Sequence, residues 1–292
     1  MRSKSCLVTG ASSGIGFETA LGLSRAGARV GIVGRSRERT EAAAARIRAA
    51  AGGPVDTFVA DLSSQAETRR LADEVLALYP RLDLLVNNAG AIFDRRMVTV
   101  DGLERTWALD HLAYLQLTLA LLDRLKASAP ARIVNLSSAA HTRGRIALDD
   151  LNGERTFGGM KAYSQAKLGN LLFTYALGRR LEGSGVTVNA VHPGVVASGF
   201  AKNLNGPLGV AWGLMRPFLI STADGARTTL HVATAPELER ISGRYFAKSR
   251  ETTSSARSLD EAMQEQVWSV SLKQLSLTDA AAGGITPSLP PS

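Results

Sequence analysis

Cysteine, aromatic residues and long apolar runs are all scarce in this sequence. The single cysteine, Cys6, excludes a disulfide within the chain and a cysteine-rich metal site. Because Cys6 lies in a short apolar run, we expect it to be a buried core residue and not a reactive thiol. No apolar run approaches the roughly 18 residues of a membrane span, and residues 1–5 are too few for a signal peptide. We therefore expect a soluble, cytoplasmic protein without an integral membrane segment.

The sequence also lacks the pattern of basic and aromatic residues that is typical of nucleic-acid binding. Its formal net charge is +8, but aromatic residues make up only 5% of it, and the arginines are scattered, often beside acids. We predict a solvated basic surface and no nucleic-acid partner, with a few arginines available to a small anionic ligand.

Histidines in metal-ligand spacing are absent as well. His111, His141 and His192 fall in a predicted helix, loop and strand, without the regular spacing of zinc ligands. His192 precedes Pro193 on an apolar strand and is expected to be a core histidine. The sequence therefore predicts no metal site.

What the chain does contain is a regular alternation of short apolar runs and amphipathic segments. The apolar runs predict strands near residues 5–9, 29–33, 55–60, 82–87, 131–137, 186–192 and 243–247. The amphipathic segments predict helices near residues 14–27, 37–51, 64–79, 102–127, 160–183 and 222–235. Continuous apolar strands are typical of a sheet covered on both faces. The pattern predicts an α/β fold with a doubly wound parallel sheet of about seven strands, like the Rossmann fold, and helices on both faces.

No linker interrupts this pattern, so we expect a single domain over residues 1–275. Residues 139–160 and 199–221 depart from it, and both follow the carboxyl ends of strands, where open α/β sheets bind their ligands. We expect these two segments to form the walls of a substrate pocket. Residues 276–292 are rich in Ala, Gly, Ser and Pro and are predicted to be a disordered tail.

A glycine-rich turn follows the first predicted strand and opens the first predicted helix. Glycines let the backbone approach a pyrophosphate, and the helix start offers free N–H groups to it. The spacing is G-x-x-x-G-x-G and not the better-known G-x-G-x-x-G. The candidate cofactor-binding residues in this turn are Gly10, Ser12, Ser13, Gly14, Ile15 and Gly16.

The end of the second predicted strand indicates which nicotinamide cofactor is used. An acidic residue there would bind the ribose 2′-hydroxyl of NAD(H), but the sequence has Arg35 and Ser36 instead. A guanidinium group suits a 2′-phosphate, so we predict NADP(H) and consider NAD(H) less suited. Arg37 and Arg39 are expected to cap and solvate the next helix.

Tyr163 and Lys167 lie four residues apart in a predicted helix and so share one face of it. A free tyrosine has a pKa near 10, and a nearby ammonium group is expected to lower it. Such a tyrosine can exchange a proton with an alcohol or carbonyl oxygen. Ser138, at the end of the fifth predicted strand, can hold the substrate oxygen beside it.

Together these motifs resemble the short-chain dehydrogenase/reductase family. They occur in the family's order, and the resemblance covers about residues 5–250. The matching motifs are TGASSGIG (9–16), DL (61–62), NNAG (87–90), Ser138, YSQAK (163–167) and PG (193–194).

A narrower resemblance is to the retinol-dehydrogenase-like branch of that family, which acts on lipophilic aldehydes, ketones and alcohols. It is carried by RIVNLSSAAH (132–141), DDLN (149–152), KLGNLLFTYALGRRL (167–181), VHPGVV (191–196) and GRYF…VWSVS (243–271).

The resemblance implies a role for each matching residue. Ser138 would orient the substrate carbonyl and Tyr163 would act as general acid/base, while Lys167 would tune Tyr163 and bind the nicotinamide ribose. Asp61 and Leu62 would flank the adenine. The further cofactor contacts implied are Asn88, Ala89, Gly90, Pro193, Gly194, Val196 and Ser198.

The sequence departs from the family at Asp110, where an asparagine usually helps to hold a water in the proton relay. An ionised aspartate accepts hydrogen bonds but donates none. We count Asp110 among the candidate catalytic residues and expect it to pair with Lys167, which would change how strongly the lysine perturbs Tyr163.

The leading hypothesis is an NADP(H)-dependent oxidoreductase that interconverts a lipophilic alcohol and its aldehyde or ketone. An alternative is a cofactor-binding regulatory protein on the same fold, with catalysis altered or lost through Asp110. Residues 207–220 also permit contact with a membrane surface, although a pocket lid or a subunit contact suits them better. The resemblance further implies that the helices at 102–127 and 160–183 can pair in a homo-oligomer.

Overall fold

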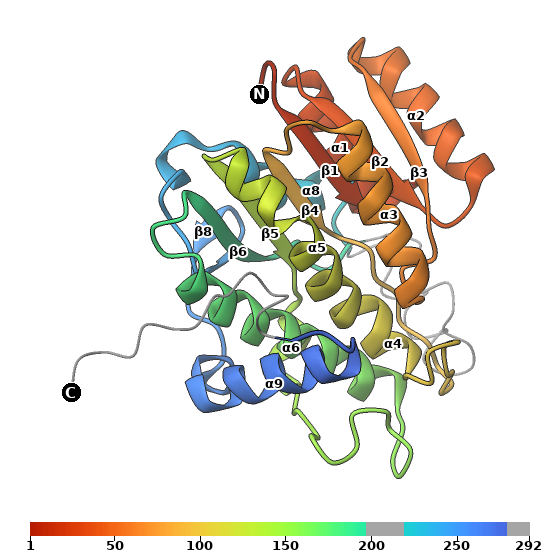
Figure 1. The fold of residues 1–292 in the computed structure, drawn as a ribbon, viewed down its shortest axis with the longest axis vertical. Coiled ribbons are helices and arrows are strands. Elements are labelled where there is room, and N and C mark those ends of the chain that lie inside the picture. Colours follow the sequence, from red (N-terminus) through yellow and green to blue (C-terminus); the bar gives the residue numbers. More distant parts are fainter. Residues whose placement is uncertain (197–218, 279–292) are drawn as a thin grey trace.

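The structure is a computed structural model, and it describes residues 1–196 and 219–278 (Figure 1). Ser198, nearly all of the predicted pocket wall at 199–221 and most of the predicted tail lie outside the described residues. The predictions made for them therefore stay predictions.

One eight-stranded sheet forms the centre of the molecule, in the order β3-β2-β1-β4-β5-β6-β7-β8. All neighbouring strands are parallel except β7 and β8, which pair antiparallel. The strand order reverses between β1 and β4, which is the switch point where ligands bind in such sheets. The strands are β1 (Ser5–Thr9), β2 (Arg29–Gly34), β3 (Val55–Val59), β4 (Leu84–Asn87), β5 (Ala131–Leu136), β6 (Val186–His192), β7 (Arg244–Ala247) and β8 (Arg250–Glu251).

The predicted doubly wound fold is confirmed, but the predicted number of strands is one too low. β8 was missed because it consists of only two residues, Arg250 and Glu251, and both are exposed. A strand of this kind has no buried side, so no apolar pattern marks it in the sequence.

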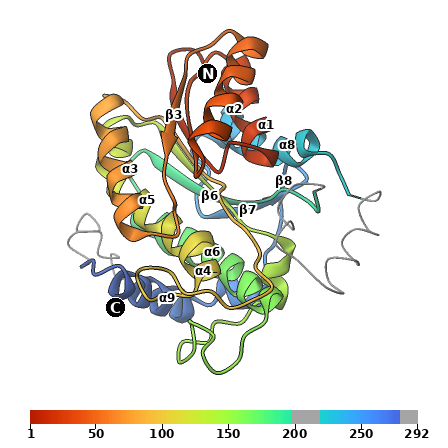
Figure 2. The ribbon, with the colours of Figure 1, turned by 90° about the vertical axis from the view of Figure 1, so that its right-hand side faces the viewer.

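Helices cover both faces of the sheet, as Figures 1 and 2 show. One face carries α3 (Gln65–Leu78), α5 (Ala113–Ala127) and α6 (Gly159–Arg180), and the other carries α1 (Gly14–Arg25), α2 (Arg37–Ala51) and α8 (Thr222–Thr234). Neighbouring strand residues such as Leu7 and Val8 point into opposite cores. This explains why the strands read as continuous apolar runs.

The last helix in the described part of the chain, α9 (Glu261–Gln274), packs against α6 on the outer side of that layer (Figure 1). The helix was not predicted. Its Asp260 caps the first turn by accepting a hydrogen bond from the backbone N–H of Met263 at 3.1 Å. Its buried side is anchored by Trp268, which stacks on Phe173 of α6 with the ring centroids 6.0 Å apart.

The single helix predicted over residues 102–127 is not continuous. A short α4 (Arg105–Trp107) is followed by one wide π-helical turn at Ala108–Leu112 and then by α5. Within this turn the Asp110 carbonyl accepts a hydrogen bond at 2.8 Å from the side-chain nitrogen of Asn170, on α6. Wide turns of this kind often lie at functional sites, and this one directs Asp110 toward the interior.

Candidate active site

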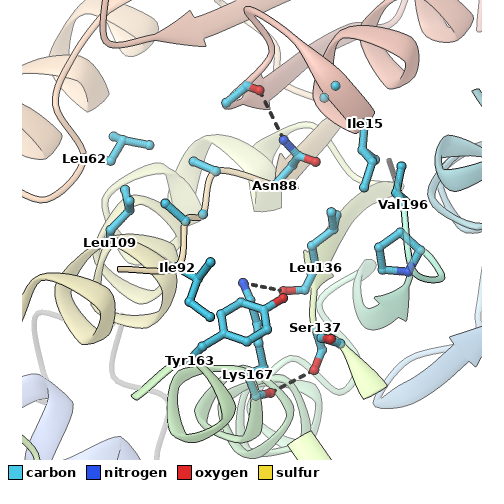
Figure 3. A pocket seen from close by; sticks show the side chains of 18 of the residues that line it. Ile15, Leu62, Asn88, Ile92, Leu109, Leu136, Ser137, Tyr163, Lys167 and Val196 are labelled. Atoms are coloured by element: carbon cyan, nitrogen blue, oxygen red, sulfur yellow. Dashed lines mark hydrogen bonds between the residues drawn. The ribbon is translucent and has the colours of Figure 1, made fainter. Parts of the chain in front are cut away.

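A cavity of about 1100 Å³ lies at the carboxyl ends of the central strands (Figure 3). Eighteen of the predicted site residues that lie in the described part of the chain line it. Asp110 does not line it, and Ser198 lies outside the described residues. The lining residues that the sequence predicted are Gly10, Ser12, Ser13, Gly14, Ile15, Gly16, Arg35, Asp61, Leu62, Asn88, Ala89, Gly90, Ser138, Tyr163, Lys167, Pro193, Gly194 and Val196.

The glycine-rich turn has the conformation of an anion-binding loop. Gly10 and Gly14 have φ angles of +66° and +64°, which side chains other than glycine rarely adopt. Ser13 begins α1 without a side-chain hydrogen bond to the helix, and the first turn contains no acidic residue. The first N–H groups of α1 are therefore left for an anionic ligand, which fits the pyrophosphate of a dinucleotide.

Asn88 ties this turn to the end of β4. Its side-chain nitrogen donates a hydrogen bond to the Thr9 carbonyl at 2.7 Å, and the Thr9 hydroxyl accepts from the backbone N–H groups of Asn88 and Ala89 at 2.9 and 3.0 Å. Figure 3 shows Asn88 below the turn, at the upper edge of the cavity. Asn88 thus fixes the position of the glycine-rich turn relative to the end of β4, two parts of the candidate cofactor site.

Positive charge gathers where the adenosine end of a dinucleotide would lie. Arg35 and Arg105 each place a guanidinium nitrogen 4.0 Å from Asp61 Oδ2. Burial works to raise the pKa of Asp61, but hydrogen bonds from Ser63 and the charges of both arginines outweigh it and hold the pKa below its usual value. Asp61 therefore stays ionised while its other oxygen accepts two hydrogen bonds from Ser63.

Arg39 also lines this part of the cavity, contrary to the expectation that it serves only the surface of α2. The first turn of α2 begins at Ser36, whose hydroxyl accepts a hydrogen bond from the Arg39 backbone N–H at 3.4 Å. This turn faces the cavity, whereas Arg37 is not a lining residue and pairs with Glu41 at 3.4 Å. The orientation of α2, which the sequence does not reveal, decides which arginine faces the site.

Ser138, Tyr163 and Lys167 line the same cavity, and Figure 3 shows Tyr163 and Lys167 together on its floor. Lys167 Nζ lies 5.5 Å from the centre of the Tyr163 ring and donates a hydrogen bond to the Leu136 carbonyl at 3.4 Å. The Ser137 hydroxyl donates to the backbone carbonyl of Lys167 at 2.8 Å. β5 and α6 are thereby joined at the point where both present their functional side chains.

The pKa of Tyr163 is held above its usual value, which corrects the expectation that Lys167 lowers it. Burial raises the pKa most, the negative charge of Asp110 raises it further, and a hydrogen bond with Ser138 lowers it. In this structure Tyr163 is therefore a protonated acid at neutral pH.

Asp110 and Lys167 form a buried ion pair behind the cavity wall. Asp110 Oδ2 lies 3.2 Å from Lys167 Nζ, and the two side chains are 0% and 4% exposed. Burial raises the pKa of Asp110 to about 6, although Lys167 and the backbone N–H of Ala91 oppose the rise. The pairing that the sequence suggested is present.

Comparison with known proteins places this site in a family. The family profile described as short chain dehydrogenase matches residues 4–208. The chain belongs to the short-chain dehydrogenase family. The family prediction drawn from its motifs is thereby confirmed.

Two similar relatives are retinol dehydrogenases, which confirms the narrower resemblance drawn from the sequence. Retinol dehydrogenase 12 of Mus musculus is 44% identical over 94% of this chain and 87% of its own length. Retinol dehydrogenase 14 of Homo sapiens is 40% identical over 93% of this chain and 86% of its own.

Solved structures of the same kind match the fold. A protein of Mycobacterium paratuberculosis has a TM-score of 0.77 at 32% identity and covers 94% of both chains. The NADP complex of RhlG from Pseudomonas aeruginosa has a TM-score of 0.69 at 30% identity and covers 85% of this chain and 95% of its own.

The cavity of this short-chain dehydrogenase has one wall that the sequence did not single out, formed by residues 91–97. Phe93 and Met97 line the cavity and contact Arg105, whose guanidinium carbon lies 4.9 Å from the Phe93 ring centre. Thr142, Arg143 and Met160 also line it, and these three lie in the predicted wall at 139–160. Met97 and Met160 are about two-fifths exposed and lie at its rim. Residues 91–97 were missed because they have no regular periodicity and belong to no helix or strand.

The histidines near the site have structural partners. The ring of His141 contacts the Ser138 carbonyl at 2.6 Å and accepts a hydrogen bond from Ser255 N–H at 3.2 Å. His192 accepts from Ala139 N–H at 3.3 Å, and burial lowers its pKa to about 4. Over residues 1–196 and 219–278 no three His, Cys, Asp or Glu side chains are grouped as metal ligands, and no helix there is long and apolar enough to cross a membrane.

Proposed function

We propose that this chain is an NADP(H)-dependent oxidoreductase that interconverts a lipophilic alcohol and the corresponding aldehyde or ketone. The observation that carries the proposal is the hydrogen-bonded pair of Ser138 and Tyr163, with Lys167 one helical turn away, on the floor of a cavity that begins at a glycine-rich turn. The family to which the chain belongs supports the class of reaction.

The cofactor would be held along the carboxyl edge of the sheet. The start of α1 would bind the pyrophosphate, and Arg35 and Arg39 would bind the 2′-phosphate at the adenosine end. NADP bound to RhlG, a relative of 30% identity, supports this preference. When bound, the nicotinamide supplies or takes up a hydride.

The chain's own residues would move the proton. Ser138 would hold the substrate oxygen beside the Tyr163 hydroxyl, and Tyr163 would donate its proton to that oxygen in reduction and take one back in oxidation. Asn88 and Ser137 would keep the two sides of the site in place through their bonds to Thr9 and Lys167.

The substrate is proposed to be lipophilic because Phe93, Met97 and Met160 add apolar surface to the cavity that Tyr163 lines. The retinol dehydrogenases among its relatives agree with a substrate of this class.

A turnover assay tests the proposal. Purified protein would be supplied with NADPH or NADH and a panel of lipophilic aldehydes and ketones, including retinal, and cofactor oxidation would be followed by absorbance. We expect turnover with NADPH, less with NADH, and a loss of at least about 100-fold in Tyr163→Phe. Tight NADPH binding without turnover by the wild type would instead favour a regulatory protein on the same fold.

A further inference from the structure

The surroundings of Asp110 suit a carboxylate and do not suit the isosteric amide. Asp110 Oδ1 accepts a hydrogen bond from the backbone N–H of Ala91 at 2.9 Å, and Oδ2 lies 3.2 Å from Lys167 Nζ. Both oxygens therefore face donors. An asparagine at this position would direct its NH₂ group toward one of them.

The carboxylate is also held rigidly and kept from water. A Cβ atom on Gly90 would lie 2.8 Å from Asp110 Oδ2 and 3.3 Å from Lys167 Nζ, so the pair fills the space directly behind the cavity wall. Apart from the ion-pair contact, Oδ2 makes no hydrogen bond within the described part of the chain. The Asp110 backbone is fixed by Asn170, which donates to its carbonyl at 2.8 Å.

Few other charges act on this pair. Lys167 Nζ lies 5.3 Å from the centre of the Tyr114 ring and 5.5 Å from that of Tyr163, both un-ionised at neutral pH because burial raises their pKa values. His111, the next residue in the turn, is neutral because burial lowers its pKa to about 3. Glu104 directs its carboxylate to the N–H groups of α4, which it caps, and its charge adds a smaller rise to the pKa of Asp110. The charge balance behind Tyr163 is therefore set mainly by Asp110 and Lys167.

We propose that Asp110 is a positioning residue that sets the pH range in which Tyr163 exchanges protons. When ionised, it neutralises Lys167 at short range and cancels much of the attraction that the ammonium group exerts on a phenolate. Tyr163 then stays protonated where a lone ammonium group would favour its ionised form. The inference rests on the proposed function, in which Tyr163 is the acid/base group.

The sign of the effect follows from the charges. The negative charge of Asp110 raises the pKa of Tyr163, so removing it lowers that pKa. Because burial raises the pKa of Asp110 to about 6, the carboxyl group takes up a proton as the pH falls through that value. Below that pH Asp110 is uncharged, and its negative charge no longer offsets the effect of the Lys167 ammonium group on Tyr163.

The pH dependence of kcat/KM for carbonyl reduction by the holoenzyme tests the inference. In Asp110→Asn and Asp110→Ala we expect the alkaline loss of activity to move to lower pH by about one unit or more, so that activity above the new midpoint falls about tenfold. Asp110→Glu keeps the negative charge, so its alkaline loss of activity should have the same midpoint pH as that of the wild type.

A second readout needs no turnover. Tyrosinate absorbance, titrated with and without NADPH, should show one tyrosine that ionises at lower pH in Asp110→Asn and Asp110→Ala than in the wild type. This signal should disappear when Tyr163→Phe is added. If the wild type reduces no carbonyl, the proposed function fails and the titration still decides the role of Asp110. Identical titrations in the wild type and both neutral variants would overturn the inference even in an active enzyme.

Discussion

A Cβ atom on Gly16 would lie 2.5 Å from the side-chain nitrogen of Asn88. The same Cβ would lie 2.6 Å from the Gly10 carbonyl oxygen. The third glycine of the cofactor turn is therefore required by the turn itself and by a residue more than seventy positions away, and not only by an approaching ligand. The same nitrogen donates to the Thr9 carbonyl at 2.7 Å, so it has little freedom to move aside. Two motifs that are separate in the sequence form one unit at the edge of the sheet.

We expect Gly16→Ala to destabilise the protein by about 1–3 kcal/mol through overpacking and to weaken NADPH binding. Urea unfolding and NADPH fluorescence measure the two effects. Gly158→Ala is the matched control, because the nearest atom to its added Cβ is 3.8 Å away. Equal stability and equal NADPH affinity for both variants would contradict the close packing of Gly16 against Asn88 and the Gly10 carbonyl.

Cofactor preference is expected to depend on Arg35 and Arg39 and not on Arg37. Removing a charge-assisted hydrogen bond to the 2′-phosphate costs about 1.5–3 kcal/mol, so Arg35→Ala should raise the KM for NADPH about 10- to 100-fold and leave that for NADH nearly unchanged. Arg39→Ala should act in the same direction. Arg37→Ala is the control, because Arg37 pairs with Glu41 and does not line the cavity. A parallel loss with both cofactors in Arg35→Ala would argue against 2′-phosphate recognition.

The buried His111 should make the protein less stable in mild acid. Its ring contacts Asn170 Oδ1 at 3.2 Å and Ser271 Oγ at 2.9 Å, and burial lowers its pKa to about 3. Below its unfolded pKa near 6.5, the unfolded chain therefore binds a proton that the folded chain does not. Stability contributed by the neutral ring is complete above pH 6.5 and falls as the pH drops toward 3, by up to about 1.4 kcal/mol per pH unit.

His111→Gln should accordingly lower the free energy of unfolding at pH 7 and flatten its decline between pH 6.5 and 4. Chemical denaturation at a series of pH values measures both. Above pH 7.5 the free energies of unfolding of the wild type and the variant should change with pH in parallel, because the His111 ring is neutral in both the folded and the unfolded state. This interval is the internal control. The same slope in both proteins at acid pH would mean that His111 takes up no proton on unfolding.

The sequence was sufficient for those features that depend on neighbouring residues. Cys6, Leu7 and Val8 alternate between the two cores, and the turn that follows has positive φ angles at Gly10 and Gly14. Such signals are local, so the strands, the main helices and the cofactor turn were predicted within a few residues. Ser138, Tyr163 and Lys167 were brought together by the order of the parallel strands, which is also a local consequence of strand–helix alternation.

The features that were missed depend on contacts between distant segments. The wide turn at Ala108–Leu112 coincides with the hydrogen bond that Asn170 donates to the Asp110 carbonyl, and nothing within residues 102–127 distinguishes it from a regular helix. Arg39 faces the cavity because of how α2 lies on the sheet. The raised pKa of Tyr163 results from burial and from the charge of Asp110. The four-residue spacing of Tyr163 and Lys167 does not reveal whether burial raises this pKa by more than the ammonium group lowers it.

The C-terminal helix α9 should be essential to the stability of the active-site layer. Trp268 is 1% exposed and packs between the Phe173 ring and the guanidinium group of Arg180, whose carbon lies 4.2 Å from the indole centre. At the end of the helix, Gln274 Oε1 accepts a hydrogen bond from Trp107 Nε1 at 2.9 Å, which links α9 to the turn that holds Asp110.

We expect Trp268→Ala to destabilise the protein by about 3–5 kcal/mol, because it removes a large buried ring. Gln274→Ala loses one hydrogen bond and should cost about 0.5–1.5 kcal/mol. Leu259→Ala, at a half-exposed position just before α9, should change stability by less than about 0.5 kcal/mol and serves as the control. Urea unfolding midpoints rank the three variants. A loss in Trp268→Ala no larger than in Leu259→Ala would show that the sheet and the inner helices fold without the support of α9.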